Sequence, residues 1–333
     1  MSFFSSMRRP DLAIDFGTAN LRVIRRDDGL VFEEPSLCCF ADRDNQLSLV
    51  AAGAAAAALV DRTPTHLKVR RPLRRGVLQD IDTARQLLRY AVPRALGRKR
   101  MGSQRAVIGV PADATKAERS ALLTAARDAG LDGVSLVSEP FAAAIGADLP
   151  VQEPSGTMIV ECGAGTTEVA VLSLGGICLS RSVRVGGASF DRAIADHLHF
   201  RHKFLIGELT AERIKREYVD MCLFDPKGEG QIEVKGRSLS SRVPAKLTLP
   251  VSEIDQVAEK HFAQVVAAIR DVLNSTPPEL SQDICEHGIV LTGGSAVTPR
   301  LRSMIEEDTG LPVTVAEDPA HCVAQGLHRI LLG

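Results

Sequence analysis

The feature that most constrains this sequence is a pattern that occurs twice: an apolar strand ending in an acidic residue and a glycine–threonine turn. The first copy spans residues 12–18 and the second spans 158–167. A further apolar run follows each copy, so both predict a β-hairpin. The two acids, Asp15 and Glu161, are about 146 residues apart, which is one ordinary domain length. We therefore interpret the chain as a duplicated domain carrying one such hairpin in each copy.

The rest of the chain predicts strands that alternate with helices. Thr115 caps one of these helices, and Glu118 stands three residues on, as in a capping box. The predicted elements are strands at 105–111, 134–137 and 288–292, helices at 115–129 and 255–273, and a helix that starts near residue 299. Residues 227–250 predict a small β-rich insertion, read either as decoration or as an outer subdomain used in contacts. Alternating strands and helices favour two α/β lobes.

Composition limits the classes of function. The 333 residues include 40 Lys and Arg against 41 Asp and Glu, so no global field favours nucleic acid, and Trp is absent. The seven cysteines form no CxxC pair, and Cys162 and Cys178 lie in apolar runs where thiols act as small hydrophobes. This fits a reducing cytoplasm. The longest Ala-rich apolar stretch, 50–60, is too short to span a bilayer.

The paired hairpins carry the chemistry. A triphosphate bound with Mg²⁺ needs backbone N–H donors that approach closely, hydroxyls, and carboxylates that hold metal-bound waters. Both hairpins supply these groups, and a third glycine turn follows at Gly293 and Gly294. The sequence has no GxxxxGK[ST] and no GxGxxG after a strand, so we expect a clamp of another kind.

From about residue 10 onward, the sequence resembles the MreB family of bacterial actin homologues. Two matches carry the resemblance best: residues 13–20, which look like the first phosphate loop, and 139–147, which look like the connecting helix. Further matches lie at 165–171, 184–187, 205–208, 210–215, 276–280, 291–294 and 315–319. The resemblance implies a two-lobed actin-like fold, ATP and Mg²⁺ as cofactors, and self-association into double protofilaments. It also implies a role in cell shape or wall synthesis at the inner face of the plasma membrane, with lipid and membrane proteins as partners.

The resemblance also assigns roles to residues. Asp15 and Glu161 would hold Mg²⁺ through waters, and Glu139 would position the attacking water, with Glu161 and Thr166 taking part in catalysis. The nucleotide would contact Asp15, Gly17, Thr18, Ala19, Asn20, Gly163, Ala164, Gly165, Thr166, Thr167, Gly187, Glu208, Glu212, Lys215, Gly293, Gly294 and Ser295.

The expected domains follow the family. Residues 1–9 would be a membrane-anchoring N-terminus. Residues 10–32, 66–147 and 316–333 would form the core of the first lobe, with 33–65 as its small subdomain. Residues 148–180 and 246–315 would form the core of the second lobe, with 181–245 as its small subdomain.

Several positions depart from the family pattern. Glu161 replaces Asp, Ala164 and Ser295 replace Gly, Ala188 replaces Asp, and Arg75 stands where relatives carry an acid. An extra methylene at Glu161 would move a carboxylate about one bond length, and misplacement by ~1 Å can lower a rate by ~100-fold. Two readings stay open: a slow ATPase, or a filament scaffold with weak or no hydrolysis. A small-molecule kinase or a DnaK-type chaperone is disfavoured, since no sugar-type pocket signature and no peptide-binding domain is seen.

Two segments remain with two readings each, and a third, which carries three histidines, has one. Phe3, Phe4 and Met7 could share a helical face beside two arginines, as a lipid anchor or as a frayed terminus. Met101 ends a basic run that is either a solvated loop or a lipid contact. His197, His199 and His202 do not all share one helical face and have no Cys nearby, so we do not expect these three to form a metal site.

Overall fold

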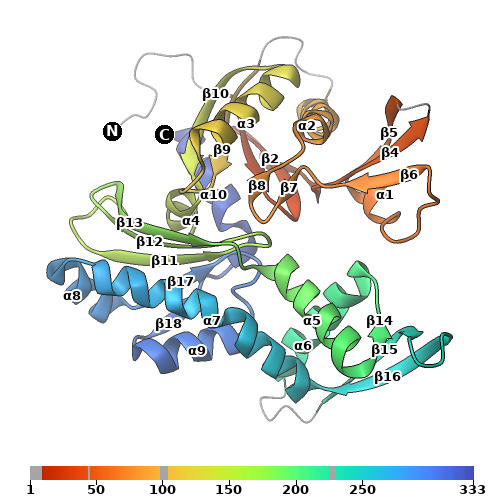
Figure 1. Ribbon diagram of the computed structural model, residues 1–333. Helices are drawn as coiled ribbons and strands as arrows, with labels where there is room; N and C mark the ends of the chain where they lie inside the picture. Colours follow the sequence, from red (N-terminus) through yellow and green to blue (C-terminus); the bar gives the residue numbers. More distant parts are fainter. Residues whose placement is uncertain (1–9, 44–45, 98–103, 225–229) are drawn as a thin grey trace.

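The computed structural model describes residues 10–43, 46–97, 104–224 and 230–333, which form two lobes (Figure 1). Each lobe is built on a five-stranded sheet, with strand order β10-β9-β1-β2-β3 in the first and β13-β12-β11-β17-β18 in the second. In both sheets three consecutive antiparallel strands continue into two parallel ones. This shared topology confirms the predicted duplication.

The strands of the first sheet are β1 (Leu12–Phe16), β2 (Asn20–Arg25), β3 (Gly29–Pro35), β9 (Gln104–Val110) and β10 (Leu131–Ser138). The helices of this lobe are α2 (Ile81–Leu96), α3 (Lys116–Asp128), α4 (Glu139–Gly146) and α10 (Cys322–Leu332), with a short 3-10 helix η2 (Pro319–His321). The predicted capping box of α3 is confirmed, because the Glu118 amide donates to Thr115 Oγ1 and the Thr115 amide donates to Glu118 Oε2.

The strands of the second sheet are β11 (Thr157–Cys162), β12 (Thr167–Ser173), β13 (Gly176–Val183), β17 (Ile289–Thr292) and β18 (Val313–Val315). Its helices are α7 (Val251–Ser275), α8 (Pro278–His287) and α9 (Pro299–Thr309). Helix α7 begins four residues before the predicted start, because Val251 and Ile254 continue its buried face. Cys162 is buried as predicted, but the prediction for Cys178 is wrong: this thiol lies on an exposed position of β13.

Two smaller units lie at one side of the lobes (Figure 1). The first contains β4 (Cys38–Arg43), β5 (Gln46–Ala52), α1 (Ala54–Ala57) and β6 (Leu67–Arg70), followed by the β7 (Leu73–Arg74) and β8 (Val77–Leu78) ribbon. The second contains α5 (Gly187–His202), β14 (Phe204–Leu205), α6 (Glu208–Phe224), β15 (Gln231–Ser238) and β16 (Pro244–Pro250). The predicted subdomain boundaries stay a proposal. Strand β6 pairs with β4 of the first smaller unit although it lies beyond the predicted end at residue 65, and β16 of the second unit extends past the predicted end at residue 245.

Helices α4 and α10 connect the lobes. Their apolar side chains share one core with residues of both sheets, including Val107 of β9 and Ala170 of β12. The two helices approach at glycine: a Cβ at position 146 would lie 1.9 Å from the Cys322 carbonyl oxygen, and one at 326 would lie 1.7 Å from that of Ala142. Only residues without a side chain permit this contact, so the pair forms a close-packed joint beneath the space between the lobes.

Candidate functional site

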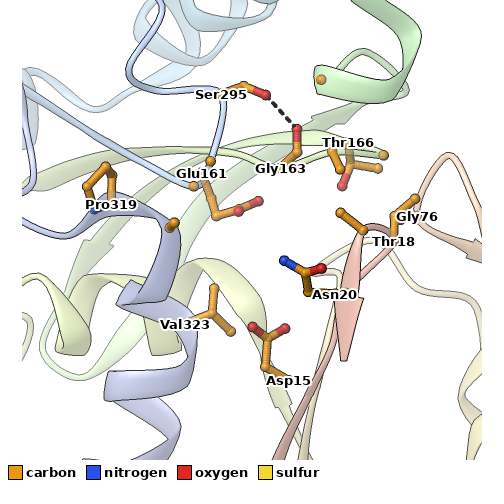
Figure 2. A pocket seen from close by; sticks show the side chains of 18 of the residues that line it. Asp15, Thr18, Asn20, Gly76, Glu161, Gly163, Thr166, Ser295, Pro319 and Val323 are labelled. Carbon is orange, nitrogen blue, oxygen red and sulfur yellow. Dashed lines mark hydrogen bonds between the residues drawn. The ribbon is translucent and has the colours of Figure 1, made fainter. Parts of the chain in front are cut away.

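A cavity of about 520 Å³ opens between the two sheets, within the size range of small-molecule sites. The turns of both predicted hairpins, β1–β2 and β11–β12, meet at its wall (Figure 2). The predicted residues that line it are Asp15, Gly17, Thr18, Ala19, Asn20, Glu139, Glu161, Gly163, Ala164, Gly165, Thr166, Gly187, Glu212, Lys215, Gly293, Gly294 and Ser295. The fold thus gathers almost the whole predicted set from distant parts of the chain.

The two hairpin turns meet without room for a side chain between them. A Cβ on Gly165 would lie 2.4 Å from Thr18 Oγ1 and 2.4 Å from the Gly76 amide nitrogen. Gly76 itself has a φ of +72°, and a Cβ there would lie 2.5 Å from Thr166 Cγ2. Turn backbones and threonine hydroxyls are therefore presented side by side, which is the arrangement that binds phosphate oxygens.

A third loop, between β17 and α9, completes the wall. Gly293 has a φ of +84°, and a Cβ there would lie 2.4 Å from the Cys162 carbonyl oxygen. The Ser295 amide donates to that same carbonyl at 2.9 Å, and its hydroxyl donates to the Gly163 carbonyl at 3.1 Å (Figure 2). Ser295 therefore ties the third loop to the second hairpin.

Asp15 lies at the end of β1 and is almost fully buried. Burial raises the pKa of Asp15, and the guanidinium of Arg22, 2.8 Å from Oδ2, opposes that rise. Arg22 also contacts Glu33 at 2.8 Å. These contacts hold the Asp15 carboxylate at the cavity wall, on the opposite side from Glu161 (Figure 2).

Glu139, Glu161 and Glu168 form a cluster in which one carboxylate oxygen from each residue lies within 4.8 Å of those from the other two. Burial raises the pKa of Glu139 and of Glu161 well above the ordinary value, and the neighbouring carboxylates add to both rises. Glu168 Oε1 accepts from the Ala112 amide and the Ser182 hydroxyl, but its buried Oε2 has no partner. Burial raises the pKa of Glu168 to about 7. The cluster can thus hold protons or a cation near neutral pH.

Lys215 and Glu212, predicted to border the nucleotide, both line the cavity but do not pair with each other. Lys215 Nζ lies 2.9 Å from an Asp191 oxygen and donates to the Gly187 carbonyl at 3.3 Å. Glu212 instead pairs with Arg216 at 2.6 Å. Lys215 therefore fixes the start of α5, where that helix meets the cavity.

Two predicted nucleotide contacts lie off the cavity wall. Thr167 is buried within β12 and donates its hydroxyl to the Val185 carbonyl at 2.8 Å. Glu208 begins α6, where its amide donates to Asp61 at 2.7 Å and its carboxylate pairs with Arg71. In this geometry Thr167 holds β12 to the segment that precedes α5, and Glu208 connects the two smaller units.

Sequence reasoning missed several wall residues. They are Phe16, Arg22, Leu73, Gly76, Pro111, Arg216, Val219, Asp220, Val297, Thr298, Pro319, Ala320 and Val323. Most are apolar and carry no motif. Phe16, inside the first hairpin pattern, and Pro319, at the end of the match at 315–319, are the two that carried a signal in the sequence.

The predicted lipid contacts Phe3, Phe4, Met7 and Met101 lie outside the described residues. Within residues that the structure does describe, we find no helix that is long and apolar enough to cross a membrane.

Two lobes of matching topology, joined by paired helices and separated by a cavity between two hairpin turns, define an actin-like fold. A model of the MreB/Mbl protein family matches residues 9–332. The chain therefore belongs to the MreB/Mbl family, as the sequence indicated.

Known relatives agree with this assignment. The chain is 42% identical over 326 residues to the cell shape-determining protein MreB of Escherichia coli strain K12, covering 97% of this chain and 93% of the relative. It is 36% identical over 316 residues to the cell shape-determining protein Mbl of Bacillus cereus, covering 95% and 94%. The crystal structure of MreB 5 of Spiroplasma citri bound to AMPPNP has a TM-score of 0.86 at 30% identity, covering 96% and 95% of the two chains. The MamK double helical filament, at 23% identity and a TM-score of 0.76, shares the fold.

Proposed function

We propose that the cavity binds ATP together with Mg²⁺, and that this binding drives assembly of the chain into double protofilaments. The observation that carries the proposal is the close approach of Gly165, Thr18 and Gly76, where the two hairpin turns and the β7–β8 turn meet and the two glycines leave no Cβ between backbone and hydroxyl groups. Backbone amides and hydroxyls that face one another across a cavity suit the oxygens of a polyphosphate. Relatives from Spiroplasma citri have been solved with AMPPNP and with ADP, which supports the same ligand class here.

The residues present fit a hard divalent cation. Asp15 and Glu161 present carboxylates from opposite sides of the cavity (Figure 2). Oxygen ligands suit Mg²⁺, which keeps several of its waters when it binds beside phosphates. Asp15 and Glu161 would hold the ion through such waters, and the ion would neutralise phosphate charge.

We further propose slow hydrolysis with Glu139 as the residue that orients water. Glu139 is the first residue of α4, half-buried at the cavity wall, and Thr166 lies on the opposite hairpin. A carboxyl whose pKa is raised by burial and by Glu168 is suited to accept a proton near neutral pH. Water orientation and charge neutralisation are the main needs of phosphoryl transfer.

The rival function is a filament scaffold with weak or no hydrolysis. Glu161 and Ala164 favour it, because both depart from the family's hairpin and Glu161 lies within the carboxylate cluster. A phosphate-release assay on assembled protein separates the two: measurable release supports the slow ATPase, and none supports the scaffold.

The cellular role we propose is cell-shape or wall-synthesis organisation in the cytoplasm, at the inner face of the plasma membrane, where membrane proteins of the cell-shape machinery would be partners. The curated relatives are cell shape-determining proteins.

The lipid contact rests on Phe3, Phe4 and Met7 with their adjacent arginines. Deleting residues 2–9 should weaken co-sedimentation with anionic vesicles more than it weakens assembly, and high salt should weaken it too. Unchanged co-sedimentation of the truncated protein would show that the N-terminus is not a membrane anchor.

Calorimetry tests the ligand proposal directly. The wild type should bind ATP only weakly without Mg²⁺, and Thr166→Arg should abolish binding, because the long side chain fills the space between the hairpins. Thr124→Arg, at an exposed position on α3, is the matched control and should bind as the wild type does. Equal ATP affinity in Thr166→Arg and Thr124→Arg would refute the phosphate clamp.

A further inference from the structure

We propose that His197, His202 and Glu253 form a binding site for a divalent transition metal of the Zn²⁺ class. The Nε2 atoms of both histidines lie 2.5 Å from the same Glu253 oxygen, Oε1. All three ligand atoms lie within 4.8 Å of one another. The site is separate from the nucleotide cavity, since none of the three residues lines that cavity.

The fold brings these residues together from two helices. His197 and His202 lie in the last turns of α5, and Glu253 lies in the first turn of α7, about 50 residues further along the chain. The three histidines of this segment do not act together, because the His199 ring instead stacks on Phe200. The spacing of the histidines alone could not predict the site, since the third ligand comes from another helix.

The ligand set is chemically specific. Two imidazoles and one carboxylate, with a remaining position for water, make a common ligand set for Zn²⁺ at bond lengths of about 2.0–2.2 Å. Ligand atoms placed tetrahedrally around the ion would be about 3.3 Å apart. The histidine nitrogens now lie 2.5 Å from Glu253 Oε1, so each must move away from that oxygen by somewhat less than 1 Å. His197, His202 and Glu253 are 23%, 24% and 13% exposed, which leaves them room to spread and leaves water access to the ion.

One neighbouring cation opposes binding. Arg201 Nε lies 3.4 Å from Glu253 Oε1. Its side chain is 70% exposed, so it can turn into solvent when a metal ion takes its place. Arg201→Ala should therefore tighten metal binding severalfold, and this effect should shrink at high salt because the repulsion is screened.

A metal ion here would fasten the end of α5 to the start of α7. The opposite end of α5 begins at Gly187, on the wall of the nucleotide cavity. We expect the bound ion to raise the thermal midpoint of the full chain by strengthening this helix contact.

The test is Zn²⁺ titration of the full chain in a Cys178→Ser, Cys285→Ser background, which removes the two exposed thiols that would also bind the ion. We expect one ion per chain. His197→Gln, which keeps a donor to Glu253, and His202→Gln should each weaken binding by about 10–100-fold or more. His199→Gln on the same helix is the matched control and should bind as the background does. Circular dichroism of each variant shows whether it folds.

Two further measurements make the outcome decisive. Co²⁺ should give the visible spectrum of nitrogen and oxygen ligands without a thiolate band, and millimolar Mg²⁺ should not displace it. Folded His197→Gln and His202→Gln proteins that bind Zn²⁺ as tightly as the background would overturn the proposal, as would the absence of any stoichiometric binding. In either case the cluster is a hydrogen-bonded contact only.

Discussion

Gly165 and Thr18, which belong to different lobes, touch across the cavity so closely that a Cβ on Gly165 would lie 2.4 Å from the threonine hydroxyl oxygen. The contact joins the turns of the two duplicated hairpins. It therefore sets how far the lobes close at the point where phosphate would bind.

Gly165→Ala should separate these turns. Overpacking at a tight contact costs about 1–3 kcal/mol, which corresponds to a loss of about 5–150-fold in ATP affinity if binding needs the closed arrangement. Gly176→Ala is the control, because the nearest atom to a Cβ there is 3.9 Å away. Calorimetry on both variants checks this, and unaltered affinity in Gly165→Ala would mean that the hairpin contact is not needed for binding.

Glu139→Ala should keep ATP binding and assembly but lower phosphate release by ~10²-fold or more, because the attacking water loses the carboxylate that orients it. If Glu161 has already moved the metal from its best position, Glu161→Asp should raise turnover in the wild-type background but not in Glu139→Ala. Phosphate release from assembled protein measures all four chains. Equal rates for wild type and Glu139→Ala, with the wild type active, would leave Glu139 as a helix-start residue only.

The contact between Asp61 and the first amide of α6 should help hold the two smaller units together. Asp61 has a φ of +58°, so Asp61→Gly removes the carboxylate without backbone strain, and Asp61→Asn keeps an acceptor that tolerates this conformation. Loss of a helix cap costs about 1 kcal/mol, so we expect bound nucleotide to leave about 3–10-fold faster from Asp61→Gly than from Asp61→Asn. Stopped-flow release of a fluorescent ATP analogue measures both rates, and identical rates would exclude a role in closure.

His261 should make the fold sensitive to mild acid. Burial lowers the pKa of His261 to about 4, although the ring hydrogen-bonds the Gly186 carbonyl. The unfolded chain, with an ordinary pKa near 6.5, binds the proton first as pH falls. His261 therefore destabilises the fold progressively from about pH 6.5 down to about pH 4 and has no such effect above that window.

Urea unfolding of the wild type and of His261→Gln checks this expectation. Between pH 7 and pH 4.5, the free energy of unfolding should fall by about 1–2 kcal/mol more in the wild type than in the variant. This energy is reduced to allow for the partial exposure of the ring. Parallel pH profiles for the two proteins would contradict it.

Much of the fold could be predicted from sequence because the decisive signals are local. Strand β1 is an apolar run broken only by Asp15, and the capping pair Thr115 and Glu118, three residues apart, marks the start of α3. Cys178 shows the limit of this reasoning. The alternation of β13 gives it an exposed position, and an apolar neighbourhood in sequence cannot tell which face of an edge strand is covered.

The site was predictable where a glycine turn follows a strand, as at Gly165, or where an acid lies near the end of one, as at Asp15. Residues that reach the cavity from the start of α10 and from η2, such as Val323 and Ala320, carry no local signal, because only the packing of the lobes brings them there. Thr167 was predicted to contact phosphate together with Thr166. Successive side chains of a strand point to opposite faces, so Thr167 points away from the cavity and donates its hydroxyl to the Val185 carbonyl.

Negative-stain electron microscopy of the purified chain with ATP and Mg²⁺ tests the central claim most directly, with Thr166→Arg and Thr124→Arg beside the wild type. The account predicts filaments for the wild type and Thr124→Arg when ATP and Mg²⁺ are both present, and none for Thr166→Arg. Filaments of the same number and length from Thr166→Arg, or from the wild type without nucleotide, would contradict it.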